Sequence, residues 1–250
     1  MSWRAKIGII FLADGSTDDE YWQLAPPGVT VHIARIWPYD IPPVYTLQLY
    51  IDQAESEEID RAARCLSIIQ PQSIAYACTS ASFVRGVGYD REIISRMEKA
   101  GGVPATTTST ASVKALQALG VKKVAVASSY KIGEISLRLR QFLEGNGFEV
   151  VSVKRFSSGE EDLDSKKALG DDTVRASLET TYQLVKEADT PDAEGIFVPN
   201  TAFRALGIVE AVEQDLGKPV VIANQATMWE ALRLAGVKPR MEGLGELYRL

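Results

Sequence analysis

Short runs of β-branched and apolar residues alternate along the chain with longer segments in which apolar residues recur at helical spacing. The short runs predict strands at Lys6 to Leu12, Val29 to Trp37, Ser73 to Ala77, Val103 to Thr106, Lys123 to Ala127, Glu149 to Arg155 and Gly195 to Val198. The longer segments predict helices at Glu55 to Ile69, Asp90 to Ala100, Thr110 to Leu119, Ile132 to Glu144 and Asp172 to Ala188. This alternation is typical of an α/β fold with a mostly parallel sheet.

The pattern occurs twice. The segment Lys114 to Val121 resembles Glu230 to Val237, and upstream of each a strand ends in a small polar cluster, Ala77 to Ser80 or Pro199 to Ala202. Chance similarity between two helices rich in Ala and Leu is the alternative explanation. A true repeat predicts two similar α/β/α halves with parallel central sheets, related by pseudo-twofold symmetry.

We expect the first half to span residues 1–120, with the C-terminal helix crossing to it, and the second to span 121–250. Ligands of such folds bind where the carboxyl ends of strands meet. The active site is therefore expected in a cleft between the halves, lined by both polar clusters.

Composition and charge exclude several classes of protein. The chain has 250 residues, of which 46% are hydrophobic and 24% charged, as in globular proteins. Its formal net charge of −6 comes without a long run of either sign, so nothing favours nucleic acid or an anionic membrane as partner. No segment approaches the roughly 18 apolar residues of a membrane span, and Met1 to Ile10 lacks a signal pattern, so we expect a cytoplasmic protein. The oligomeric state is left open.

Two cysteines are too few for a disulfide scaffold, and no Cys or His partners suggest a metal site. Cys78 follows the strand Ser73 to Ala77 and precedes Thr79, Ser80 and a predicted loop, Ala81 to Tyr89. A thiol there can act as acid, base or nucleophile, beside hydroxyls that could stabilise an oxyanion. The alternative is a small buried apolar residue, which is the role we expect for Cys65 on its helix.

Four segments carry a family resemblance: Ala77 to Gly86, Thr106 to Ala125 with Tyr130 beyond it, Gly195 to Ala202, and Trp229 to Gly236. They resemble the aspartate/glutamate racemase superfamily, in its maleate isomerase and arylmalonate decarboxylase branch. The similarity runs from about residue 73 to the C-terminus, and the middle segment is most similar to the decarboxylases.

The resemblance implies a cofactor-independent, cysteine-dependent enzyme that acts on a small carboxylate or dicarboxylate through an enediolate. Cys78 would be the catalytic residue. The carboxylate would be held by Thr79, Ser80 and Tyr130, with backbone N–H groups near Thr201. Neutral donors in a dry cleft can stabilise an enediolate without a metal. A packing role for Tyr130 is the alternative.

The chain departs from the family at Asn200, where related racemases and isomerases carry a second cysteine. An asparagine side chain cannot exchange a proton near neutral pH, so a two-thiol relay for racemisation is not expected. Asn200 could hold a substrate atom or cap the following helix. Ser16 could contact substrate, or Ser16 or Thr17 could cap a helix. His32 is expected in the core or at a sheet edge.

Three functions follow from these residues. The favoured one is decarboxylation of a malonate-like acid, in which Cys78 protonates the enediolate. The second is cis–trans isomerisation of a maleate-type acid, in which the Cys78 thiolate adds, the bond rotates and the thiolate leaves. The third is non-catalytic carboxylate binding. The substrate's side chain is not determined, because pocket residues would come from the irregular segments Trp37 to Leu47 and Ser157 to Gly170.

Overall fold

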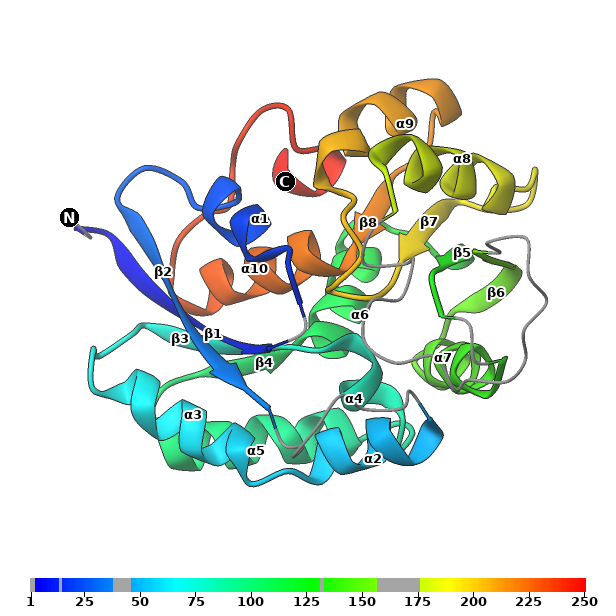
Figure 1. Ribbon diagram of the computed structural model, residues 1–250. Helices are drawn as coiled ribbons and strands as arrows, with labels where there is room; N and C mark the ends of the chain where they lie inside the picture. Colours follow the sequence, from blue (N-terminus) through cyan, green and yellow to red (C-terminus); the bar gives the residue numbers. More distant parts are fainter. Residues whose placement is uncertain (1–2, 14, 38–45, 131–132, 157–175) are drawn as a thin grey trace.

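The protein contains two parallel four-stranded sheets placed side by side (Figure 1). The computed structural model describes residues 3–13, 15–37, 46–130, 133–156 and 176–250. The first sheet has the order β2-β1-β3-β4 and the second the order β6-β5-β7-β8. The strands are β1 (Ala5–Leu12), β2 (Val29–Ile36), β3 (Ser73–Ala77), β4 (Ala105–Thr107), β5 (Lys123–Ser128), β6 (Glu149–Arg155), β7 (Gly195–Val198) and β8 (Val220–Ile222). The strand order of the second sheet is that of the first with every strand number raised by four. The predicted pair of similar α/β halves is therefore confirmed.

Helices cover the faces of both sheets. They are α1 (Asp18–Gln23), α2 (Leu47–Glu55), α3 (Glu58–Ser67), α4 (Thr79–Phe83), α5 (Tyr89–Gly101), α6 (Thr108–Ala118), α7 (Gly133–Gly145), α8 (Leu178–Ala188), α9 (Val209–Leu216) and α10 (Ala223–Leu234), with short 3₁₀ turns at Leu206–Ile208 and Glu246–Tyr248. In the first half, α3 and α5 lie on one face of the sheet and α1 and α10 on the other (Figure 1). The C-terminal helix α10 packs against α6, β3 and β4.

Residue 120 lies between α6 and β5, where the chain passes from one sheet to the other. The division into halves at 120 and 121 stays a prediction. None of the described helices is long and apolar enough to cross a membrane.

The central strands are mostly apolar because helices cover both of their faces. Every residue of β3 and of β7 is buried, and those two strands lie inside their sheets. Their predicted bounds, and those of β6, are the observed ones. A parallel sheet of this kind places the ends of β3 and β7, and the residues that follow them, at the carboxyl edge.

Two expectations for the first half are wrong. Cys65 is exposed rather than packed, because the buried stripe of α3 runs through Ile59, Ala62, Ala63 and Leu66 and leaves Cys65 beside it. The predicted loop from Ala81 is helical at its start, since α4 continues to Phe83 and all its residues are buried. Most of the segment Trp37 to Leu47, all of Ser157 to Gly170 and the start of the helix predicted at Asp172 lie outside the described residues.

Candidate active site

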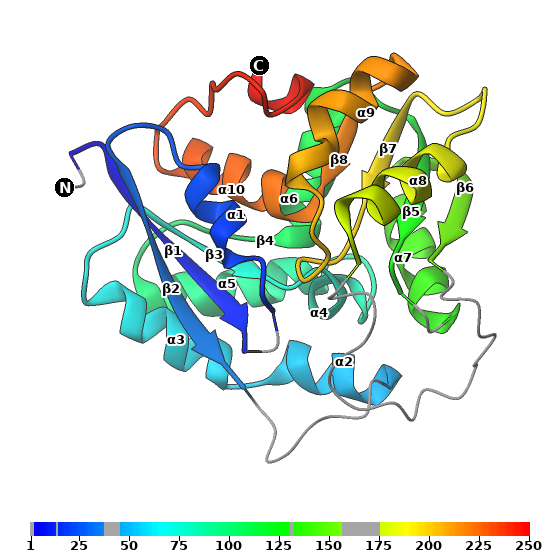
Figure 2. The same cartoon turned by 45° about the horizontal axis from the view of Figure 1, so that its top comes forward.

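The residues after β3 and β7 meet in space, although more than a hundred positions separate them in the sequence. The Asn200 backbone N–H donates to the Thr79 hydroxyl at 3.1 Å. The Thr201 hydroxyl donates to the Ala77 carbonyl, also at 3.1 Å. Figures 1 and 2 show the loop after β7 passing beside the start of α4. The two polar clusters that the repeat singled out therefore form one site.

Cys78 is buried at the end of β3, in extended backbone just before α4. Its thiol donates to the Gln53 side-chain oxygen at 3.9 Å and lies 3.7 Å from the Ser80 hydroxyl. Gln53 is itself buried and comes from α2 of the same half. The thiol thus has polar neighbours within a largely apolar core, as a group that must give or take a proton requires.

The Tyr130 side chain is buried at the end of β5, and its hydroxyl has no hydrogen-bond partner among the described residues. The ring edges of Tyr50 and Phe83 pack against it, with centroids 6.3 and 6.0 Å away. A buried hydroxyl without a partner costs about 1–3 kcal/mol. An oxygen of a bound ligand would satisfy it.

Burial raises the pKa of Tyr130 well above its ordinary value, and the nearby Tyr50 and Cys78 raise it further. The neighbouring hydroxyls of Thr79 and Ser80 oppose this pKa rise, but burial prevails. Tyr130 is therefore neutral near neutral pH and can donate a hydrogen bond to a carboxylate.

Buried hydroxyls hold the backbone around Cys78 and Thr79. The Ser82 hydroxyl lies 2.8 Å from the Cys78 carbonyl and 2.9 Å from the Thr79 carbonyl. The Ser109 hydroxyl, from the first turn of α6, donates to the Thr79 carbonyl at 3.0 Å. These side-chain contacts add to the backbone hydrogen bonds at the start of α4, and they help to fix the direction of the chain where the thiol is attached.

Asn200 has a left-handed backbone conformation, with φ of 81°. Its side-chain oxygen accepts from the Ala202 N–H at 3.0 Å, and its amide donates to the Ser129 hydroxyl at 2.9 Å. Asparagine adopts positive φ more readily than most residues and closes such turns through its own side chain. The interpretation as a helix cap is wrong, because no helix begins directly after Asn200.

The N-terminal loop reaches the second half, but through Thr17 rather than through the Ser16 side chain. Ser16 is exposed, and its carbonyl accepts from the Arg204 guanidinium at 3.0 Å. Thr17 precedes α1 without capping it, and its buried hydroxyl donates to the Thr201 carbonyl. Among the described residues, no hydrogen bond joins the Ser16 side chain to the residues around Cys78, so its substrate contact stays a prediction.

His32 lies on β2, at the edge of the first sheet, where its ring forms a hydrogen bond of 2.9 Å with the Thr30 hydroxyl. Partial burial, together with the charge of Lys6, lowers its pKa. The expected sheet-edge position is confirmed. In the described part of the chain, no group of three or more His, Cys, Asp or Glu side chains could hold a metal ion.

Sequence reasoning missed Gln53 beside the thiol and a buried polar cluster, built from Glu20 and Asn224, behind the Thr201 carbonyl. Neither lies near Cys78 or Thr201 in the sequence, and neither belongs to a recognisable motif. The sequence offered one hint of this cluster. Glu20 directly precedes two aromatic residues, Tyr21 and Trp22, in a segment too short to show a helical pattern.

Comparisons with known proteins agree with this geometry. A family model described as arylmalonate decarboxylase matches residues 51–248. The arylmalonate decarboxylase of Bordetella bronchiseptica is 33% identical over 173 residues, covering 68% of each chain. A maleate isomerase of Geobacillus stearothermophilus is 25% identical over 197 residues, covering 76% of this chain and 74% of its own.

Among solved structures, a double variant of arylmalonate decarboxylase in its liganded form superposes with a TM-score of 0.82. In that variant one glycine is replaced by cysteine and one cysteine by serine. It is 28% identical, and the match covers 98% of this chain and 99% of the other. The resemblance to both groups of enzymes, inferred above from four segments, is confirmed.

Proposed function

Because the chain belongs to the arylmalonate decarboxylase family, we propose that it is a cysteine-dependent, cofactor-independent decarboxylase of malonate-like acids. One observation carries the proposal: the buried thiol of Cys78 shares its surroundings with the buried hydroxyl of Tyr130, for which the described residues provide no hydrogen-bond partner. The first can deliver a proton, and the second can hold the negative charge that develops before the proton arrives.

The reaction balances with these groups alone. Tyr130, Thr79 and Ser80 donate hydrogen bonds to the carboxylate that the product retains. The bond from the α-carbon to the other carboxylate breaks, carbon dioxide leaves, and the electron pair spreads into the retained carboxylate as an enediolate. The Cys78 S–H then gives its proton to the α-carbon, and the thiolate recovers a proton from water. Fixed neutral donors in a site of low dielectric stabilise the enediolate most, because it carries more charge on oxygen than the substrate's carboxylate.

Asn200 gives this chemistry its handedness. It stands across from Cys78 at the equivalent strand end, and its backbone N–H is held by Thr79. An amide cannot supply a proton near neutral pH. Protonation therefore comes from the Cys78 face only, and a malonate with two different α-substituents gives a single enantiomer.

Isomerisation of a maleate-type acid is the second candidate, favoured by the similarity to maleate isomerase. The Cys78 thiolate would add to one carbon of the double bond, and the electron pair would move into the carboxylate on the other carbon. Rotation about the resulting single bond and loss of the thiolate would give the trans acid. The same donors would stabilise the intermediate, but this reaction requires the thiol to ionise before it acts.

Proton NMR of the purified protein, incubated separately with 2-methyl-2-phenylmalonate and with maleate, tests both candidates without added metal or cofactor. Conversion of the disubstituted malonate to 2-phenylpropanoate, a chiral monoacid, supports the decarboxylase, and fumarate signals support the isomerase. If neither substrate reacts but malonate protects Cys78 from alkylation, the protein binds carboxylates at this site without turnover. Absence of protection would contradict the site assignment itself. A Cys65→Ser background removes the exposed thiol from the alkylation assay.

A further inference from the structure

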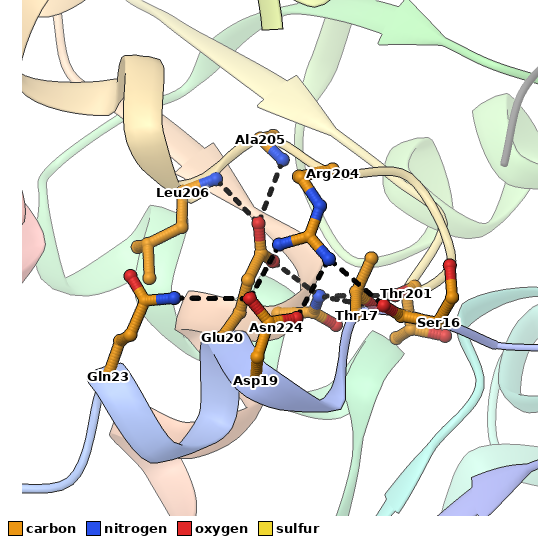
Figure 3. Close-up of polar contacts among 10 residues, drawn as sticks. All are labelled: Ser16, Thr17, Asp19, Glu20, Gln23, Thr201, Arg204, Ala205, Leu206 and Asn224. Carbon is orange, nitrogen blue, oxygen red and sulfur yellow. Dashed lines mark hydrogen bonds and ion pairs between the residues drawn. The ribbon is translucent and has the colours of Figure 1, made fainter. Parts of the chain in front are cut away.

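A buried carboxylate lies just behind the site and takes no part in the chemistry above. Glu20, on α1 of the first half, is only 1% exposed. One of its oxygens accepts from the backbone N–H groups of Ala205 at 3.1 Å and Leu206 at 2.9 Å. The other accepts from the Asn224 amide at 2.6 Å (Figure 3). One side chain of the first half therefore holds two separate segments of the second.

The orientation of the Asn224 amide is fixed from both sides. Its oxygen accepts from the buried Tyr21 hydroxyl at 2.8 Å, so its nitrogen must face Glu20. The same nitrogen lies 3.1 Å from the Thr201 carbonyl, to which the Thr17 hydroxyl also donates. Figure 3 shows Glu20, Asn224 and Thr17 converging on this stretch of chain. The oxygen and the nitrogen of the Asn224 amide are thus both hydrogen-bonded. A fully paired buried network of this kind favours a single arrangement of its side chains.

This network ends on the residues of the site. Thr201, whose carbonyl it holds, contacts the end of β3 through its hydroxyl and follows Asn200. At the far end of the same segment, Glu20 holds Ala205 and Leu206. The segment 200–206 is thus held near its start by Thr17 and Asn224 and at its end by Glu20 of α1. A left-handed conformation at a residue other than glycine persists only where its surroundings enforce it, and Asn200 has one.

A neutral residue in place of Glu20 would lose hydrogen bonds that the carboxylate accepts. Both Glu20 oxygens accept from donors that cannot reverse their polarity, two backbone N–H groups on one side and an oriented amide on the other. The nearby Arg204 is engaged by Asp19, at 2.7 and 2.8 Å, and by the Ser16 carbonyl. Burying a carboxylate without direct ion pairing costs several kcal/mol, so stability alone does not explain Glu20.

We propose that Glu20 is a positioning residue of the active site, which acts through Asn224 and the Thr201 carbonyl to hold Asn200 and Thr201 against the substrate. The inference rests on the proposed function, because it assumes that Asn200 and Thr201 face the bound carboxylate. It assigns to α1 a role in orienting the substrate relative to Cys78.

Glu20→Gln is the direct test. The glutamine oxygen can still accept from Ala205 and Leu206, but its amide then faces the Asn224 amide, donor against donor. The matched control is Glu213→Gln. Glu213 is a buried glutamate on α9 that also accepts from two backbone N–H groups, those of Val220 and Glu246 at 2.8 Å each, and no hydrogen bond joins it to the described site residues.

Two properties separate positioning from simple stability, namely KM and the enantiomeric excess of the product. Neither changes when a variant merely contains fewer folded molecules. We expect Glu20→Gln to raise KM about tenfold, the effect of losing one charge-assisted hydrogen bond, and to lower the enantiomeric excess. Glu213→Gln should leave KM and the enantiomeric excess at their wild-type values, even if it lowers the unfolding temperature as much as Glu20→Gln does.

Equal effects of the two variants, or a Glu20→Gln enzyme with unchanged KM and enantiomeric excess, would overturn the proposal. If Glu20→Gln does not fold, Thr17→Val removes the other donor to the Thr201 carbonyl, and the same two readouts decide. If the wild-type protein turns over neither substrate, the proposed function fails by itself. The positioning role is then decided by the malonate concentration that half-protects Cys78 from alkylation, which Glu20→Gln should raise and Glu213→Gln should not.

Discussion

The ends of β3 and β7 occupy equivalent places in the two halves, yet they differ in side chain and in backbone. After β3 the chain is extended at Cys78 and presents a buried thiol. After β7 it turns through a left-handed Asn200, whose side chain closes the turn. The repeated fold brings the two ends together, and the side chains decide that one end can transfer a proton while the other can only hold and orient. Similar halves thus give an asymmetric site.

Removal of the Cys78 thiol should have the strongest effect on the difference between the two strand ends. Cys78→Ala should lower turnover about 10³-fold or more, because the chemical step loses its proton donor while the hydrogen-bond donors remain. Carboxylate binding, measured by calorimetry with malonate, should stay close to that of the wild type. The exposed Cys65 provides the control, since Cys65→Ser should change neither property. Retained turnover in Cys78→Ala would contradict every mechanism based on this thiol.

Tyr130→Phe tests the proposed donor of the second half, whose ring packs against Tyr50 and Phe83 of the first. We expect kcat/KM to fall about 10²-fold, the usual effect of removing one donor to a developing oxyanion. The unfolding temperature should stay the same or rise, because the hydroxyl has no partner among the described residues and its burial is unfavourable. A large loss of stability with little loss of activity would instead show that Tyr130 only packs.

Adding a thiol at the β7 end should make the two ends alike. Asn200→Cys would allow protonation from the opposite face, so the enantiomeric excess of the product should fall and the product acid should exchange its α-proton with deuterated water. The left-handed φ disfavours cysteine, so we expect a stability loss of about 1 kcal/mol. Asn200→Ser is the control, because it removes the amide without adding a thiol. Combined with Cys78→Ala, the new cysteine should give the opposite enantiomer.

The smallest expected effect concerns the pH dependence of stability at the contact between the halves. Burial raises the pKa of Glu20 above its ordinary value of 4.5, although Asn224 and two backbone N–H groups oppose the rise. The folded protein therefore keeps this proton to higher pH than the unfolded chain. As the pH rises from 4.5 through the raised pKa, Glu20 contributes a decreasing free energy of unfolding.

Urea unfolding of the wild-type protein and of Glu20→Gln, near pH 4.5 and near neutral pH, measures this contribution. The wild-type free energy of unfolding minus that of the variant should be smaller at the higher pH. A difference that is independent of pH would show that Glu20 has the same pKa in the folded and unfolded states.

The sequence alone determined the two parallel sheets and the repeat, and it supplied the residues that we propose for the site. The bounds of β3, β6 and β7 were predictable because runs of consecutive apolar residues between turn signals are a local property. Cys78, Thr79 and Tyr130 came from the segments that resemble the family, and their roles in the site stay predictions. The exposure of Cys65 was not, because it depends on which side of α3 faces the sheet.

Only the tertiary structure revealed the contacts that join the halves. Thr79 meets Asn200 across 121 positions, and Glu20 meets Asn224 across 204, so neither pairing leaves a periodic or spaced signal in the sequence. The left-handed turn at Asn200 likewise depends on hydrogen bonds that Asn200 donates to the Thr79 and Ser129 hydroxyls. Local patterns fix secondary structure because they arise from neighbouring residues, whereas the geometry of this site arises from buried polar groups that find partners only when the two sheets have packed.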